Sequence, residues 1–171
     1  SLLISAVNFS ESYTGASATH GYTNNVWPIA NLQLLSATYY DNYDFITPLV
    51  NGGNAAITTY NYQPSDIIGQ YQYDPSGSQK NFPRVAGKAT GTKTNILGSS
   101  NYLYSVSYFD DNGRTVQTIS QNHKTGTVRV TTNFDFTGKV PETKRINLVN
   151  GVETSLKETF AYDHGGRLLM V

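Results

Sequence analysis

Carboxylates recur at a fixed place in a short pattern, Asp-x-x-Gly, and they are the first residues of this sequence to consider for chemistry. The copies run from Asp74 to Gly77, Asp110 to Gly113, Asp135 to Gly138, and Asp163 to Gly166. Two such acids could serve a glycosidase if their carboxyl groups lay roughly 5–9.5 Å apart. One acid per copy, always at the same turn position, instead indicates a structural role, because an Asp side chain accepts backbone N–H groups two residues further on.

Other chemistry finds less support in the sequence. Asp110-Asp111-Asn112-Gly113 presents oxygens in a tight loop, but the complete calcium-binding loop with its terminal bidentate Glu is missing. The histidines stand in polar contexts without His-x-x-x-His spacing, at His20, His123 and His164. No Gly-x-Ser-x-Gly occurs, and the stretch 87–94 lacks the spacing of a phosphate loop. We therefore predict no catalytic residue, no metal ligand and no cofactor.

The residues around each Asp-x-x-Gly copy repeat as well. An aromatic residue precedes every copy, at Tyr73, Phe109, Phe134 and Tyr162. A cation follows the glycine in the last three, at Arg114, Lys139 and Arg167. Gly at the fourth position permits a left-handed exit from a type I turn, so each copy predicts a tight connection between two strands. We expect the aromatic ring to lie on a neighbouring strand and the cation to pair with the turn Asp or with the next unit.

Composition narrows the function classes. The chain has 171 residues, 14% of them charged, a formal net charge of zero, and thirteen tyrosines. A neutral surface lacks the basic excess that binding to a phosphate backbone requires, so we expect no nucleic-acid partner. The absence of cysteine excludes disulfides and thiolate metal sites. No apolar run reaches the roughly 20 residues of a membrane-spanning helix, so we predict no membrane-spanning segment.

Thr, Tyr, Val and Ile are frequent, helical periodicity is nearly absent, and turn residues interrupt the chain every dozen or so residues. We predict an all-β fold, an antiparallel meander of strand-turn-strand units. The expected strands of the second half are Tyr102–Phe109, Arg114–Ser120, Thr127–Phe134, Lys139–Val149, Val152–Tyr162 and Arg167–Val171. Those of the first half are Leu2–Phe9, Gln33–Tyr40, Ala55–Tyr62 and Ile67–Tyr73. We expect a loop or an edge passage at Gly77–Thr94.

The regularity of the pattern changes along the chain. Residues 1–100 are expected to form an irregular β region with degenerate repeats, and residues 101–171 a regular meander. No clear linker separates them, so we predict one continuous β body, truncated at both ends. The last strand, Arg167–Val171, begins directly after a turn and is expected to continue in a longer polypeptide.

These units carry a family resemblance. Phe109–Val116, Phe134–Val140 and Tyr162–Leu169 resemble the Tyr-Asp-x-x-Gly-Arg-Leu core of the YD repeats in bacterial rearrangement-hotspot (RHS) proteins. The stretch Thr90–Val171 is similar to large RHS-repeat proteins, whereas the first half is similar only through Tyr39–Phe45 and Tyr73-Asp74. Phe replaces Tyr in two copies, Lys replaces Arg in one, and Pro141 stands at a strand position.

The resemblance implies β-ribbons that spiral into an RHS-type shell around a C-terminal toxin or effector. On that basis we expect a non-catalytic structural segment of a secreted or surface-displayed shell that encloses or presents another polypeptide. The implied partners are the remainder of a longer RHS polypeptide or its C-terminal cargo, secretion machinery, and other surface proteins. Export across the outer membrane, with the type IX route as one option, is likewise implied.

The aromatic residues leave an alternative from another class open, a β-rich carbohydrate-binding or adhesion module. Aromatic faces stack on the apolar faces of sugars, and Tyr hydroxyls add hydrogen bonds. The residues considered for this role are Trp27, Tyr40 and Tyr43. The competing interpretation is that these rings form the hydrophobic layer between ribbons.

Overall fold

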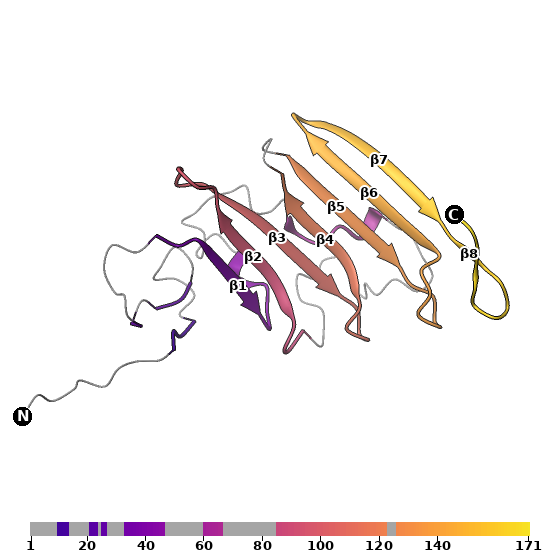
Figure 1. Ribbon diagram of the computed structural model, residues 1–171, viewed down its shortest axis with the longest axis horizontal. Coiled ribbons are helices and arrows are strands. Elements are labelled where there is room, and N and C mark those ends of the chain that lie inside the picture. Colours follow the sequence, from indigo (N-terminus) through magenta and orange to yellow (C-terminus); the bar gives the residue numbers. More distant parts are fainter. Residues whose placement is uncertain are drawn as a thin grey trace, which may run out of the picture.

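The computed structural model describes residues 10–13, 21–23, 25–26, 33–46, 60–66, 85–122 and 126–171. In these residues the protein is all-β, with a seven-stranded antiparallel meander, β1 to β7, and a separate hairpin, β8 and β9 (Figure 1). The described part contains no α-helix, and hence no helix that could cross a membrane. The strands are β1 Ser36–Tyr40, β2 Ala89–Asn95, β3 Tyr102–Phe109, β4 Thr115–Gln121, β5 Thr127–Asn133, β6 Glu142–Val149, β7 Val152–Thr159, β8 Ala161–Tyr162 and β9 Leu168–Met170.

The strands expected in the second half are confirmed, with differences at their ends. β3 has the predicted bounds, β4 is shifted by one residue at both ends, and β5 ends one residue earlier than predicted. β6 begins later than expected because Pro141 precedes it without an N–H to donate; its carbonyl accepts the N–H of Phe160 at 2.9 Å instead. The expected strand Val152–Tyr162 is divided at Phe160 into β7 and β8.

The expectation of a loop or an edge passage over Gly77–Thr94 is wrong at its C-terminal end. Residues 89–95 form β2, an interior strand hydrogen-bonded to β1 on one side and to β3 on the other. Its alternating threonines suit a pleated surface. Gly91, which suggested a break, provides space: a Cβ placed there would lie 2.1 Å from Cζ of Phe45.

The other strands expected in the first half have mixed outcomes. Gln33–Tyr40 is confirmed in its second part, since β1 begins at Ser36. For Ala55–Tyr62, the described end, residues 60–62, is not a strand. Leu2–Phe9 and Ile67–Tyr73 lie outside the described residues.

The register gives the sheet two different faces. On one face of the sheet, a row of directly paired residues crosses all seven strands: Tyr39, Gly91, Val106, Ile119, Arg129, Ile146 and Ser155. We call this face of the sheet the covered face. The adjacent row on the opposite side, the open face, consists of small neutral residues: Thr38, Thr92, Ser105, Ser120, Val128, Asn147 and Thr154.

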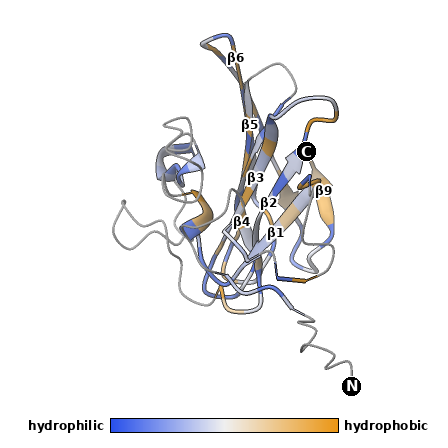
Figure 2. Cartoon of the chain, turned by 90° about the vertical axis from the view of Figure 1, so that its left-hand side faces the viewer, coloured by the Kyte–Doolittle hydropathy of each residue, from blue (hydrophilic) through white to orange (hydrophobic). Residues whose placement is uncertain are grey.

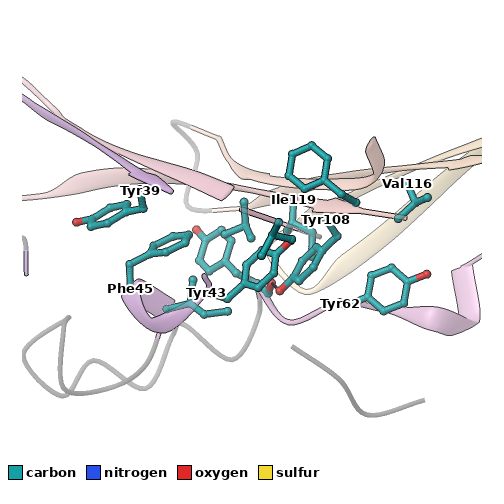
Figure 3. Close-up of a cluster of buried hydrophobic side chains, with 12 residues drawn as sticks. Tyr39, Tyr43, Phe45, Tyr62, Tyr108, Val116 and Ile119 are labelled. Atoms are coloured by element: carbon teal, nitrogen blue, oxygen red, sulfur yellow. Dashed lines mark hydrogen bonds between the residues drawn. The ribbon is translucent and has the colours of Figure 1, made fainter. Parts of the chain in front are cut away.

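Residues 42–46 and 60–66 follow β1 and precede β2 in the sequence, and they pack against the covered face. We call them the covering segment. They include two short 3₁₀ helices, η1 Asp44–Ile46 and η3 Pro64–Asp66. In the edge-on view of the sheet, the described parts of this segment lie on one side (Figure 2). Tyr43 stacks on Tyr108 with ring centroids 4.7 Å apart, and Phe45 stacks on Tyr39 at 4.4 Å (Figure 3). The hydrophobic core is therefore an aromatic layer between the sheet and its covering segment.

Buried polar groups attach the covering segment to the sheet. Asp66 forms a bidentate ion pair with Arg129 on β5. Gln117 on β4 donates to the carbonyl of Gln63 at 3.0 Å and accepts the N–H of Gln63 at 2.9 Å. These bonds satisfy groups that would otherwise be desolvated without a partner, so they fix where the segment lies.

Candidate functional site

The three Asp-x-x-Gly turns in the described residues, called corners below, lie along one rim of the β structure, at the lower ends of the strands in Figure 1. In the corner Asp110–Gly113, the Asp110 carboxylate accepts the N–H groups of Asn112 and Arg114 at 2.9 and 2.8 Å and the Nε–H of Arg114 at 2.6 Å. The N–H of Asp110 donates to the Arg114 carbonyl at 2.9 Å. Gly113 has φ of 73°, the left-handed conformation that favours glycine. Both oxygens of this acid are thus committed to the turn.

The corners beginning at Asp135 and Asp163 repeat this geometry. Each carboxylate accepts the N–H of the residue four positions later, Lys139 at 2.9 Å and Arg167 at 2.8 Å. The pKa of Asp135 is lowered mainly by the hydrogen bond from the Thr137 hydroxyl, and the pKa of Asp163 mainly by the hydrogen bond from the backbone N–H of Arg167. Lowered values mean that these carboxylates hold their negative charge firmly, as acceptors, and they do not suit a general acid.

Successive corners contact one another through cations and rings. The Arg114 guanidinium lies over the Phe134 ring, 4.4 Å from its centroid, and Lys139 Nζ lies 5.5 Å from the centroid of Tyr162. In both cases the cation after one corner covers the aromatic residue that opens the next. A cation over a ring contributes about 0.5–1 kcal/mol at exposed sites and more where water is excluded. The structure confirms the expected contact with the next unit and identifies the ring as its partner.

The corner glycines lie under the same cations. A Cβ at Gly138 would lie 3.5 Å from Arg114 Nη1, and one at Gly166 would lie 3.2 Å from Lys139 Cε. Both glycines have positive φ, 89° and 81°. The backbone conformation of the turn therefore favours glycine at both positions, and at Gly166 the cation of the preceding corner also leaves little room for a Cβ.

A related corner joins two segments that are far apart in the sequence. It differs from the complete corners in that Asp41 has φ of 71° and Gly87 donates to the Asp side chain, whereas the other corner glycines donate to the backbone carbonyl of their Asp. The N–H of Asp41 donates to the Lys88 carbonyl at 3.2 Å, and the Asp41 carboxylate accepts the N–H of Gly87, although Asp41 and Gly87 are 46 positions apart. Gly87 has φ of 74°. Lys88 Nζ then lies 5.8 Å from the centroid of the Phe109 ring, as the cation of a complete corner would.

The strand pairing supports the same equivalence. The β1–β2 pair has its bulge between Tyr39 and Tyr40, and the β3–β4 pair has one between Tyr108 and Phe109. The covering segment therefore occupies the position of the two variable residues of a corner. Sequence reasoning missed this site, because Tyr40-Asp41 and Gly87-Lys88 each carry only half of the pattern.

The remaining candidate residues have separate outcomes. The Asp74–Gly77 corner and Trp27 lie outside the described residues. Tyr40 is 51% exposed, whereas Tyr43 is 2% exposed and its hydroxyl donates to the Ser107 carbonyl at 3.0 Å. Burial raises the pKa of Tyr43. This corrects the expectation of Tyr43 as a sugar-stacking residue, because its ring faces are taken up by the core.

The interactions along the rim are suited to holding neighbouring turns together. Its carboxylates accept hydrogen bonds from their own turns, and its cations lie over neighbouring rings. In the described ranges, no three His, Cys, Asp or Glu side chains gather in a way that could hold a metal ion. His164 is exposed in the last corner, and the other histidines lie outside the described residues.

No family model, no curated protein and no solved structure matches this chain.

Proposed function

We propose that this protein is a non-catalytic structural segment of a secreted or surface-displayed shell of the RHS-repeat kind, whose ribbons enclose or present another polypeptide. The observation that carries the proposal is the contact of each corner with the next, from Lys88 to Phe109, Arg114 to Phe134 and Lys139 to Tyr162. A repeated unit that interacts with its neighbours through contacts of one type, a cation over an aromatic ring, builds an extended array.

The use of the charged groups supports this proposal over catalysis. A catalytic carboxylate needs a free oxygen directed at a substrate, with a pKa suited to proton transfer. Here Asp110 and Asp163 each bind the backbone and the guanidinium of their own corner, with Nε–Oδ2 distances of 2.6 and 2.7 Å. The repeated acids therefore stabilise turns, and the activity of the protein lies in the continuity of its sheet.

The unequal faces also fit a wall. The covered face carries the aromatic layer, whereas the open face presents a row of small neutral side chains that includes Thr92, Ser105 and Ser120. This row contains no charged side chain and no large apolar side chain. A row of this kind offers few strong contacts to a neighbouring polypeptide, which suits a shell that later releases its content.

Electron microscopy of the native protein, isolated with the polypeptides that accompany it, tests the proposal. We expect curved ribbons that surround density for a second polypeptide, and protection of that polypeptide from added protease. The Asp110→Ala and Asp135→Ala changes combined should remove the protection by opening the rim. A free-standing sheet with nothing protected contradicts the proposal.

Two controls separate this role from others. Protease treatment of intact source cells should cleave the protein if it is secreted or displayed on the surface. Binding to a glycan array that is lost in Tyr40→Ala would instead favour the carbohydrate-binding alternative, because Tyr40 is the candidate ring that is exposed in the described part of the chain.

A further inference from the structure

We propose that the ring of Tyr40 is a binding site for an arginine side chain of a partner polypeptide, which takes the place that a cation of the chain itself holds at the other corners. This site goes beyond the proposed wall function, because it identifies a point at which a second polypeptide attaches. It depends on a comparison of the aromatic residues that stand directly before a corner Asp, which we call the opening rings.

Three of the opening rings in the described part of the chain are covered by a cation. The cation lies 4.4 to 5.8 Å from the ring centroid, in the pairs Lys88 with Phe109, Arg114 with Phe134, and Lys139 with Tyr162. In the sequence, each cation precedes its ring by 20 to 23 positions. The contact is therefore a regular property of the rim, with a fixed kind of partner and a nearly fixed spacing.

Tyr40 is an opening ring without such a cover. It precedes Asp41 as Phe109 precedes Asp110, it lies at the same kind of bulge, and β1 ends at the same rim (Figure 1). Phe109 is 8% exposed, whereas Tyr40 is 51% exposed. Within the ranges that the structure describes, no Lys or Arg lies over the Tyr40 ring. The position that a cation fills at the other corners is open to solvent here.

The preceding part of the sequence does not supply this cation. A spacing of 20 to 23 positions leads back from Tyr40 to residues 17–20, which read Ser-Ala-Thr-His. These residues lie outside the described ranges, but their identities contain no Lys or Arg. Residues 1–79 as a whole contain neither of these two residue types. A permanent cation over Tyr40 must therefore come from elsewhere.

The surroundings of Tyr40 favour a positively charged partner. All twelve Lys and Arg residues fall in 80–171, whereas 1–79 carry five acids, Glu11, Asp41, Asp44, Asp66 and Asp74. Burial raises the pKa of Tyr22, and the nearby Tyr40 and Asp41 raise it further, so a second ring and a carboxylate lie close to the site. A local excess of negative charge attracts a cationic side chain and adds to the attraction of the ring face.

The contacts inside the chain indicate which cation fits best. Of the three covered opening rings, Phe134 has the shortest contact, with the Arg114 guanidinium 4.4 Å from its centroid. A guanidinium is planar and weakly hydrated, so it stacks on a ring face more readily than an ammonium group does. We therefore assign the site to arginine, with the geometry that Arg114 shows on Phe134.

Nuclear magnetic resonance of the full chain with carbon-13-labelled tyrosine rings tests the site. The probe is a peptide with the sequence of Gly113–Gln117, Gly-Arg-Thr-Val-Gln, acetylated and amidated so that Arg is its single charge. At pH 8, where histidines of ordinary pKa are neutral, we expect a saturable shift of the Tyr40 ring signals. The same peptide with citrulline in place of Arg should bind roughly 2- to 5-fold more weakly, because it keeps the shape and lacks the charge.

Three variants locate the contact. Tyr40→Phe identifies the Tyr40 signals by their loss; it keeps the ring, so the binding of the Arg peptide to its backbone and neighbours should be retained. Tyr40→Leu should remove the preference for the Arg peptide over the citrulline peptide. Phe136→Leu is the matched control, since Phe136 is 82% exposed on the same rim and does not open a corner, and it should leave binding unchanged. Circular dichroism checks that each variant is folded.

The remaining outcomes count against the site. Tyr40 signals that do not move up to the solubility limit of the Arg peptide overturn the proposal. Equal binding of the Arg and citrulline peptides shows that the charge is not recognised, and a preference for Arg that survives in Tyr40→Leu shows that the contact lies on another residue. Tyr40 signals that move with neutral oligosaccharides and not with the Arg peptide support the carbohydrate-binding alternative instead.

Discussion

Replacing Asp110 with alanine tests the structural role of the corners most directly. The Asp110 side chain is 5% exposed, and its carboxylate accepts bonds from two backbone N–H groups and from the Arg114 guanidinium. A hydrogen bond with one charged partner contributes about 1.5–3 kcal/mol, and removing one partner of a buried pair leaves the others desolvated. The loss of stability should be smaller than the sum of three such hydrogen bonds, because Arg114 keeps its contact with the Phe134 ring and Asn112 is exposed to water.

We therefore expect Asp110→Ala to lower the free energy of unfolding by about 3–4 kcal/mol. Asp110→Asn keeps an oxygen that accepts the two backbone N–H groups and loses the charge, so it should cost about 1–2 kcal/mol. The exposed neighbour provides a matched control, since Asn112→Ala keeps the corner backbone and should change stability by less than about 0.5 kcal/mol.

Urea unfolding at neutral pH, followed by far-ultraviolet circular dichroism, measures these differences. The slopes of the unfolding curves must agree between variants for the comparison to hold. The same change at Asp163, whose partner Arg167 has a side chain 82% exposed, should cost clearly less. If Asp110→Ala costs no more than Asn112→Ala, or no more than Asp163→Ala, the reasoning about this corner is refuted.

Three more predictions follow from the contacts of the core and the rim. Gly91→Ala places a Cβ 2.1 Å from Cζ of Phe45, so it should displace that ring and lower stability by about 1–3 kcal/mol, with loss of near-ultraviolet dichroism. Asp66→Ala leaves the Arg129 guanidinium without its carboxylate and should cost about 3–5 kcal/mol in thermal or urea unfolding; Arg129→Met added to it should recover part of the loss. Asp135 has its pKa lowered from 3.8 in the folded chain, so its contribution is present above that pH and is lost as the pH falls below it. Asp135→Asn should therefore make urea unfolding less dependent on pH in the acid range, and an unchanged pH profile would contradict the role of this carboxylate.

Local signals in the sequence account for the regular half of the sheet. The corners at Asp110, Asp135 and Asp163 follow from residues within four positions of one another, and their glycines carry the positive φ that the turn requires. β3 was predicted with its observed bounds because a polar turn stands at each of its ends. Where the determining contacts are close in sequence, composition and spacing are sufficient.

Distant contacts explain what the sequence did not reveal. β2 was assigned to a loop because Pro83 and several glycines, Gly91 among them, fall in residues 77–94, and the reason for Gly91 is the Phe45 ring from another segment. The ion pair of Asp66 with Arg129 joins residues 63 positions apart and has no local pattern. Tyr43 belonged to a dense aromatic interval that fitted both a sugar site and a core, and only its burial against Tyr108 decides between them.

The corner formed by Asp41 and Gly87 has a kinetic consequence. Closing the connection between Asp41 and Gly87 over 46 positions costs roughly 2 kcal/mol more chain entropy than closing a four-residue turn, since each doubling of loop length adds about 0.6 kcal/mol. The strands β3 to β7 are joined by short connections and can form early from nearby contacts. β1 should therefore join the sheet last and separate from it first, and its amide hydrogens should exchange with solvent faster than those of β4, which makes the N-terminal margin the place where this structure begins to unfold.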